Sequence, residues 1–207
     1  MQFLKQVDAM RYYELPLSGF QERIDGRKKA IQERLQADST LYKMDGFLST
    51  DSLKNFVYQS FDDEDPTAAY RGNGGRSLNI STPQTIFEGE IPNIKKGDNI
   101  NLSFWAHDLR KFPLANTFVY IKLIDPETDA VLWQFRPQIR YLLSVMANDG
   151  WALVDLPFSL PTDGILEISI GNKEMEEQPF LVDELMIRKE ETELYRKGEI
   201  YWNNRAY

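Results

Sequence analysis

The sequence contains no cysteine and only one histidine among its 207 residues. The absence of cysteine excludes disulfides, thiolate nucleophiles, cysteine zinc sites and iron–sulfur clusters. The lone histidine, His107, excludes the histidine-pair sites of HExxH metalloenzymes. No apolar run approaches the roughly 18 residues that a membrane-spanning helix needs, so we expect no direct membrane insertion by this segment. The first residues, MQFLKQVDAM, intersperse apolar and charged side chains, which is not typical of a signal peptide.

Positive charge is also scarce, because 24 Lys and Arg residues face 32 Asp and Glu residues and the net charge is −8. Nucleic-acid binding gains affinity by neutralising phosphates, so we expect no nucleic-acid partner. The composition is 42% hydrophobic and 13% aromatic, which is enough apolar surface to offset the entropy of folding. The length fits one globular domain with an appendage.

Helical spacing is confined to the N-terminal region. One short amphipathic helix is predicted around residues 3–10, and Pro16 separates it from a second, for which Ser18 is a candidate N-cap. The apolar stripe of the second helix is formed by Phe20, Ile24, Ile31 and Leu35. Gly26 should weaken this helix. Two helices this polar cannot enclose a core, so residues 1–45 are interpreted as a helical appendage or linker from a larger protein.

Residues 46–190 show short strand-like runs separated by Gly, Pro, Asn and Asp. We predict strands at 56–61, 76–81, 85–90, 99–107, 117–125, 131–135, 142–146, 152–158, 166–170 and 181–188. Strands at this spacing without intervening helices indicate a mainly β protein, an antiparallel β-sandwich. Residues 191–207 are an aromatic and polar C-terminal extension.

The order of several motifs in this region resembles the jelly-roll, galactose-binding-like superfamily, which includes many carbohydrate-binding modules. The motifs, spread over residues 51–189, are FDDED (61–65), YRGNGGRSLNIS (70–81), KKGDNINLSFWAHD (95–108), DGWALVDLPFSLP (149–161), ILEISIGN (165–172) and LVDELMIRK (181–189). The resemblance implies a noncatalytic carbohydrate-binding module, part of a larger extracytoplasmic or membrane-associated glycan-handling protein. Because one fold hosts many functions, the alternative is a structural or protein-interaction domain with no sugar site.

The resemblance also implies a structural Ca²⁺ between the first and last strands. The implied ligands are Asp62, Glu64 and Asp183, since calcium takes six to eight oxygen ligands. Asp62 departs from the glutamate usual in these relatives and is one methylene shorter. The alternative interpretation is a solvated acidic turn before Pro66, with Asp183 accepting backbone N–H bonds.

Alternation along residues 99–107 places Asn101, Trp105 and His107 on one polar face of a strand. The same alternation along 117–125 sends Tyr120 and Lys122 outward. If the two strands are neighbours, these five side chains share a face suited to sugar, because aromatic faces stack on pyranose rings while polar groups bond hydroxyls. The alternative interpretation is that Trp105 lies beneath the N-terminal helices.

No enzymatic activity is predicted. The chain lacks GxSxG, and the loop YRGNGG lacks the Gly-Lys-Ser/Thr ending of a phosphate loop. That loop is expected to supply positive φ angles for a tight turn, with Tyr70, Arg71 and Asn73 placed to contact a ligand at the end of the sandwich. Trp133, with Arg136 and Arg140, either lines a groove or closes a hairpin.

Overall fold

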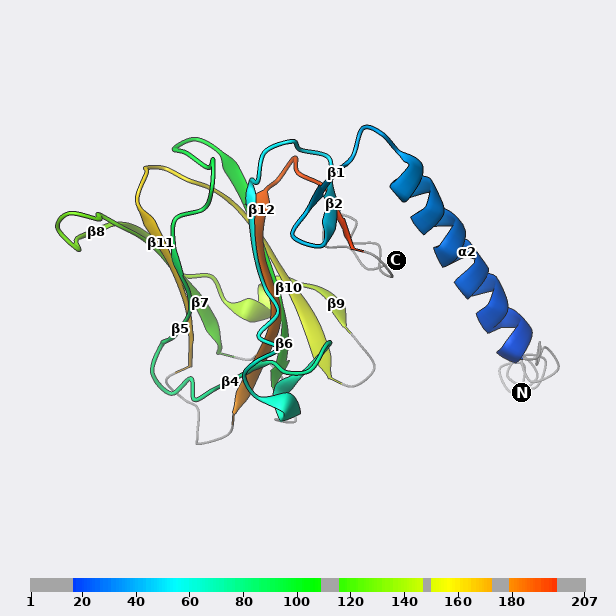
Figure 1. The fold of residues 1–207 in the computed structure, drawn as a ribbon. Coiled ribbons are helices and arrows are strands. Elements are labelled where there is room, and N and C mark those ends of the chain that lie inside the picture. Colours follow the sequence, from blue (N-terminus) through cyan, green and yellow to red (C-terminus); the bar gives the residue numbers. More distant parts are fainter. Residues whose placement is uncertain (1–16, 109–115, 147–149, 173–178, 197–207) are drawn as a thin grey trace, which may run out of the picture.

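The computed structural model describes residues 17–108, 116–146, 150–172 and 179–196 (Figure 1). Two antiparallel sheets face each other and enclose the main core, which confirms the predicted β-sandwich. The larger sheet has the order β3 (Phe56–Gln59), β12 (Phe180–Lys189), β6 (Asn99–Asp108), β10 (Trp151–Ser159) and β9 (Leu143–Met146), with β4 (Arg76–Leu78) also paired to β12. The smaller sheet has the order β5 (Gln84–Gly89), β11 (Ile165–Gly171), β7 (Phe118–Ile124) and β8 (Val131–Phe135).

Side-chain alternation explains why these segments form strands of a sandwich. In β7, Val119, Ile121 and Leu123 are buried while the residues between them are half-buried, so one face lies on the core and the other lies outside. The two short 3₁₀ helices, η1 (Pro66–Ala68) and η2 (Ile139–Tyr141), lie in connections between strands. Each of the ten predicted strands coincides with a strand of one of the two sheets.

A third, small sheet covers part of the outer face of the larger sheet. It has the order β1 (Tyr42–Met44), β2 (Phe47–Ser49) and β13 (Leu194–Arg196), and it joins segments from either side of the sandwich sequence. Its apolar residues pack in a second core with Phe56 and Met186. This cover explains why β12 is buried on both faces. The sequence did not predict these strands, because three residues are too few to show alternation.

The second predicted helix is present as α2 (Leu17–Ala37), whereas the first, at 3–10, lies outside the described residues. The described side chains of α2 are exposed or half-exposed, and Figure 1 shows the helix standing apart from the sandwich. The expectation that the helices cover Trp105 is therefore wrong for α2. In the parts of the chain that the structure describes, no helix is long and apolar enough to cross a membrane.

Candidate functional site

Aromatic side chains gather on the outer face of the larger sheet, at the end away from the small sheet. The ring of Tyr70 stacks on the indole of Trp105, with centroids 3.9 Å apart and planes inclined by 23°. Trp151 lies 5.4 Å from Tyr70, and His107 lies 5.3 Å from Trp151, both measured between centroids. We call Tyr70, Trp105, His107 and Trp151 the outer aromatic cluster.

The members of the outer aromatic cluster differ in exposure. Trp105 and Trp151 are only 3% and 6% exposed, whereas Tyr70 and His107 are half-exposed. The guanidinium carbon of Arg71 lies 5.0 Å from the centre of the Tyr70 ring and 5.9 Å from that of Trp105. The cluster therefore offers solvent a tyrosine ring supported by a buried indole, with cationic and imidazole groups at its margin.

The glycine-rich loop that carries Tyr70 closes around one carboxylate. Gly72 has φ +66°, and a Cβ there would lie 2.0 Å from Oδ1 of Asp62. A Cβ at Gly75 would lie 2.1 Å from the carbonyl oxygen of Ala68. The Asp62 carboxylate accepts a hydrogen bond from the backbone N–H of Asn73 at 2.7 Å. The loop thus adopts the tight turn expected from its glycines.

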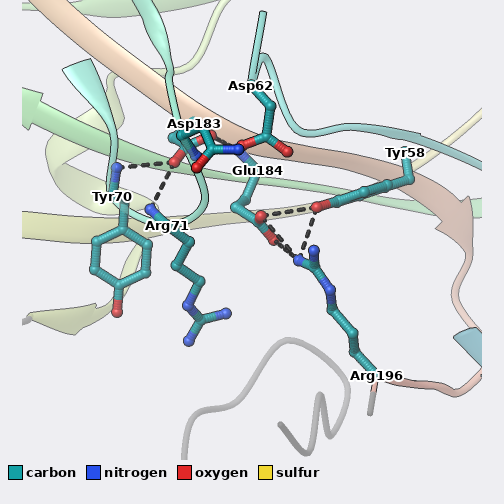
Figure 2. A network of polar contacts seen from close by, with 8 residues as sticks. Tyr58, Asp62, Tyr70, Arg71, Asp183, Glu184 and Arg196 are labelled. Carbon is teal, nitrogen blue, oxygen red and sulfur yellow. Dashed lines mark hydrogen bonds and ion pairs between the residues drawn. The ribbon is translucent and has the colours of Figure 1, made fainter. Parts of the chain in front are cut away.

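A second carboxylate, Asp183 of β12, anchors the start of this loop (Figure 2). Its Oδ2 accepts the backbone N–H groups of Tyr70 at 2.8 Å and of Arg71 at 2.9 Å, and its Oδ1 accepts the N–H of Glu184 at 2.7 Å. The Asp183 residue is fully buried. Burial raises the pKa of the carboxyl to about 6, outweighing the three N–H bonds that lower it.

A β-bulge in β12 brings a second acidic side chain to the same region. The register with β6 shifts between Asp183 and Met186, and Glu184 has a positive φ of 53°. The Glu184 carboxylate accepts the Tyr58 hydroxyl at 2.7 Å and pairs with Arg196 Nη1 at 2.9 and 3.0 Å. Figure 2 shows Asp183 contacting the Tyr70 loop while Glu184 extends toward Arg196 of β13. The bulge therefore holds two segments against the outer face of the larger sheet, the Tyr70 loop through Asp183 and strand β13 through Glu184.

The predicted single ligand face is wrong, because its residues lie on different sheets. Trp105 and His107 are on β6, whereas Tyr120 and Lys122 are on β7, whose neighbours are β11 and β8. The connection from β6 to β7 passes from one sheet to the other. Alternation along a strand shows which side chains point inward but not which sheet the strand joins. Trp105 and His107 remain together in the outer aromatic cluster, but Trp105 is buried beneath Tyr70 rather than exposed.

The other predicted ligand residues make contacts within the protein. Lys122 forms an ion pair with Glu167 at 2.6 Å on the outer face of the smaller sheet. Tyr120 lies over Gly171, where a Cβ would be 3.1 Å from its Cε2 atom. Asn101 is buried on β6 and donates its amide N–H to the Asp155 carboxylate. None of these three side chains belongs to the outer aromatic cluster.

The three predicted calcium ligands do not form a metal site among the described residues. The Glu64 carboxylate is paired with the Arg76 guanidinium, at 2.8 Å to Nε and 2.5 Å to Nη2. Asp62 and Asp183 accept the backbone N–H bonds given above, which for Asp183 is the alternative interpretation stated at the outset. Within the described ranges, no group of three or more carboxylate or imidazole side chains is arranged to hold a metal ion. Calcium therefore stays a prediction without an observed ligand set.

The sequence did not identify Tyr70 as the exposed ring of the cluster. It placed Tyr70 only in a loop near the end of the sandwich, because the loop's position over β6 depends on Asp183, 113 positions later. An aromatic residue beside closely spaced glycines was the available signal. Trp133 lies in β8, which pairs with β7, and its ring stacks near those of Phe135 and Phe158.

Comparisons with known proteins give similarities of fold. No family of sequences and no curated protein matches this chain. Among solved structures, the CBM22-1 xylan-binding domain of Paenibacillus barcinonensis Xyn10C is 11% identical with a TM-score of 0.40, over 71% of this chain and 87% of that one. The enzymatically active domain of tailspike protein 4 of bacteriophage CBA120 is 12% identical with a TM-score of 0.39, over 71% of this chain and 20% of that one.

A third similar structure is the glycosylation-associated protein (Gap123) complex of Streptococcus agalactiae, 15% identical with a TM-score of 0.37, over 65% of this chain and 44% of that chain. With TM-scores of 0.40 or less, these matches carry no argument about function, so any statement about a ligand depends on the residues of this chain.

Proposed function

We propose that this chain is a noncatalytic carbohydrate-binding module whose ligand surface is the outer aromatic cluster. The observation that carries the proposal is the half-exposed Tyr70 ring stacked on buried Trp105, with Arg71 and His107 at its margin. Aromatic faces pack against the C–H faces of pyranose rings, while guanidinium and imidazole groups bond hydroxyls. Such a module acts where polysaccharides occur, as part of an extracytoplasmic glycan-handling protein.

The anchoring of the loop supports this proposal. Two backbone N–H groups, those of Tyr70 and Arg71, are held by one fully buried carboxylate. A loop fixed in this way loses little conformational freedom when a ligand binds, so more of the interaction energy is retained as affinity.

The state of two carboxyl groups of β12, Asp183 and Glu184, supports a noncatalytic role. Glycoside hydrolysis uses two carboxyl groups that flank the scissile bond and are accessible to it. Asp183 is fully buried with both oxygens bonded to backbone N–H groups, and Glu184 is buried and paired with Arg196. Neither is presented to a sugar that lies on Tyr70.

The second candidate function is a structural or protein-interaction domain without a sugar site. The observation that favours it is α2, whose 21 residues span about 31 Å at 1.5 Å per residue. Its described side chains are exposed or half-exposed. A polar helix of this length spaces the sandwich from its surroundings without contributing to its core.

The test compares Tyr70→Ala with the matched control Tyr120→Ala, a half-exposed tyrosine on the other sheet. Affinity electrophoresis through a panel of soluble xylans, glucans and galactans identifies a ligand, and calorimetry measures its affinity. Removing a stacked ring should weaken binding roughly tenfold, while the control binds like the parent. Equal losses in both variants would remove the cluster from the site. A parent that binds none of the panel would favour the second candidate.

A further inference from the structure

Helix α2 carries a narrow apolar stripe along one side. At about 100° per residue, four apolar positions fall within roughly 60° of one another around the helix axis, namely Phe20, Ile24, Ile31 and Leu35. Ile31 is 40% exposed and Leu35 is half-exposed. A helix that packs on a globular core has an apolar face about 100° wide or more, whereas a stripe as narrow as this one is typical of a coiled-coil seam.

The charged residues of α2 are sorted by sign around this stripe. Arg27, Lys28 and Arg34 are exposed and lie within roughly 70° of the centre of the stripe, on both sides of it. Lys29 lies on the far side of the helix, where it pairs with an acidic residue at 3.9 Å. The acidic residues of the helix all lie roughly 110° or more from the centre of the stripe: Glu22, Asp25 and Glu33. The apolar stripe is therefore bordered by positive charge alone.

The helix has the properties of an element that a partner stabilises. Its described side chains are exposed or half-exposed, and Figure 1 shows it extending away from the sheets. Helices in proteins gain most of their stability from packing an amphipathic face, and short helices without such packing are marginal in water. Gly26, in the middle of α2, lowers its intrinsic stability further. Covering the stripe would therefore stabilise the helix and also bury its apolar residues.

We propose that α2 is a docking helix for a partner protein, and that the partner presents an amphipathic helix whose apolar stripe is bordered by Asp and Glu. The two stripes pack against each other as in a two-stranded coiled coil. Carboxylates at the borders of the partner's stripe pair with Arg27, Lys28 and Arg34. Charges at these bordering positions determine which helices pair, so the purely basic border of α2 selects an acidic partner.

The same charge pattern disfavours a second copy of α2 as the occupant. Two α2 helices packed stripe to stripe would bring cations together at the borders in either orientation, because none of the acidic residues lies there. Like charges at these positions destabilise a helix pair.

An anionic membrane is also disfavoured. A helix that lies in a membrane interface presents a broad apolar face of large residues, which four positions within roughly 60° do not form. Five basic residues against three acidic ones give α2 a net charge of +2, whereas the whole chain carries −8. An anionic lipid surface would therefore attract the helix but repel the remainder of the chain.

The first test measures binding of a fluorescein-labelled synthetic peptide by fluorescence anisotropy. The peptide has about four heptads, with Leu at positions a and d and Glu at positions e and g, and a second peptide has Lys in place of each Glu. The parent protein should bind the acidic peptide at least about tenfold more tightly than the basic one, and added salt should weaken this binding. A parent that binds neither peptide, or both equally, would overturn the proposal.

The second test reverses one charge on either side of the helix. Arg27→Glu, beside the stripe, should weaken binding of the acidic peptide at least about tenfold and strengthen binding of the basic peptide. The matched control is Lys29→Glu on the far side, which changes the net charge by the same amount and should bind like the parent. Equal losses in the two variants would show that overall charge alone attracts the peptide, and the proposal would fail.

The apolar stripe is tested by Ile31→Ala, which removes buried area from the interface while keeping a good helix former. Its affinity for the acidic peptide should fall about tenfold. Val131→Ala, at an exposed apolar residue of the smaller sheet, is the control and should bind like the parent. An unchanged affinity of Ile31→Ala would mean that no stripe-to-stripe packing occurs.

The other occupants are tested with two further measurements. Sedimentation with phosphatidylcholine vesicles, with and without phosphatidylserine, tests the membrane, and analytical ultracentrifugation over a wide concentration range tests a second copy. We expect neither binding to the anionic vesicles nor a dimer that Arg27→Glu dissociates. Either result would name a different occupant for α2 and overturn the proposal. None of these measurements bears on whether Tyr70 binds sugar.

Discussion

The carboxylate of Asp183 accepts hydrogen bonds from the backbone N–H groups of Tyr70 and Arg71, more than a hundred positions earlier in the chain. These bonds connect the last long strand of the sandwich to the loop that carries the exposed ring of the outer aromatic cluster. The position of that ring is therefore set by one buried side chain.

The first prediction concerns Asp183→Asn. The Asn side chain keeps the shape but has one acceptor oxygen, so at least one of the backbone N–H groups faces an amide N–H and loses its partner. We expect a loss of about 1–3 kcal/mol in the free energy of unfolding, measured by urea denaturation. Asp63→Asn, at an exposed position of the neighbouring acidic turn, is the control and should unfold like the parent.

The second prediction is a pH dependence from the same carboxyl. Burial raises its pKa in the folded state from 3.8 to about 6, so the folded protein holds this proton more tightly than the unfolded chain does. The associated stability is full below pH 3.8 and is lost as the pH rises through 6. At about 1.36 kcal/mol per unit, the loss is up to about 3 kcal/mol.

Other carboxyls act in the opposite direction. Hydrogen bonds from backbone and side chains lower the pKa of Asp62, Asp65 and Asp98, so their contribution is lost at acid pH. The measurement is therefore the difference in unfolding free energy between the parent and Asp183→Asn at each pH. As the pH rises from 4 to 6, the parent should lose unfolding free energy relative to Asp183→Asn. A flat difference would show that Asp183 does not titrate in this range.

The third prediction concerns the buried pair of Glu184 and Arg196. Glu184 is buried, and Arg196→Leu removes the cationic partner of its carboxylate while the hydrogen bond from Tyr58 is kept. Loss of a charged partner should lower the free energy of unfolding by about 1–3 kcal/mol. Adding Glu184→Gln should recover part of this loss, because the buried negative charge that has lost its cationic partner is removed. A double-mutant cycle in urea measures the coupling, and strictly additive effects would contradict it.

The fourth prediction compares two glycines. Gly72→Ala must accommodate a Cβ in contact with Asp62 at a positive φ, so we expect a clear fall in melting temperature and weaker binding at Tyr70. Gly26→Ala, with nothing within 4 Å of the new Cβ, should instead raise the helix content of α2. Circular dichroism follows both effects. Equal melting temperatures for Gly72→Ala and the parent would show that the loop accommodates the added methyl group at little cost.

Much of the fold was predictable because the residue pattern that identifies a strand lies within the strand and its flanking turns. Alternation along β7 and the turn residues that flank it identify the strand without knowledge of its neighbours. The candidate site was less predictable because it depends on pairings that alternation does not encode. Trp105 and Tyr120 have the same outward pattern on consecutive strands, yet they belong to different sheets.

The cover over Trp105 was missed for the same reason. Helical periodicity pointed to the N-terminal region, but the cover is Tyr70, placed by hydrogen bonds to Asp183. Likewise, β13 is recognisable as a strand only through its partner β2, from the far end of the chain.

The glycine-rich loop separates the positions that fix its shape from the positions that it displays. Gly72 and Gly75 admit no side chain, since a Cβ at either would meet another residue at about 2 Å. Arg71 and Asn73 lie on either side of Gly72 and contact the anchoring carboxylates through backbone N–H groups, which any residue except proline supplies. Substitution at 71 and 73 therefore changes the chemistry beside the Tyr70 ring without redesign of the scaffold. In a randomised library selected for folded protein, these two positions should vary while the glycines stay fixed.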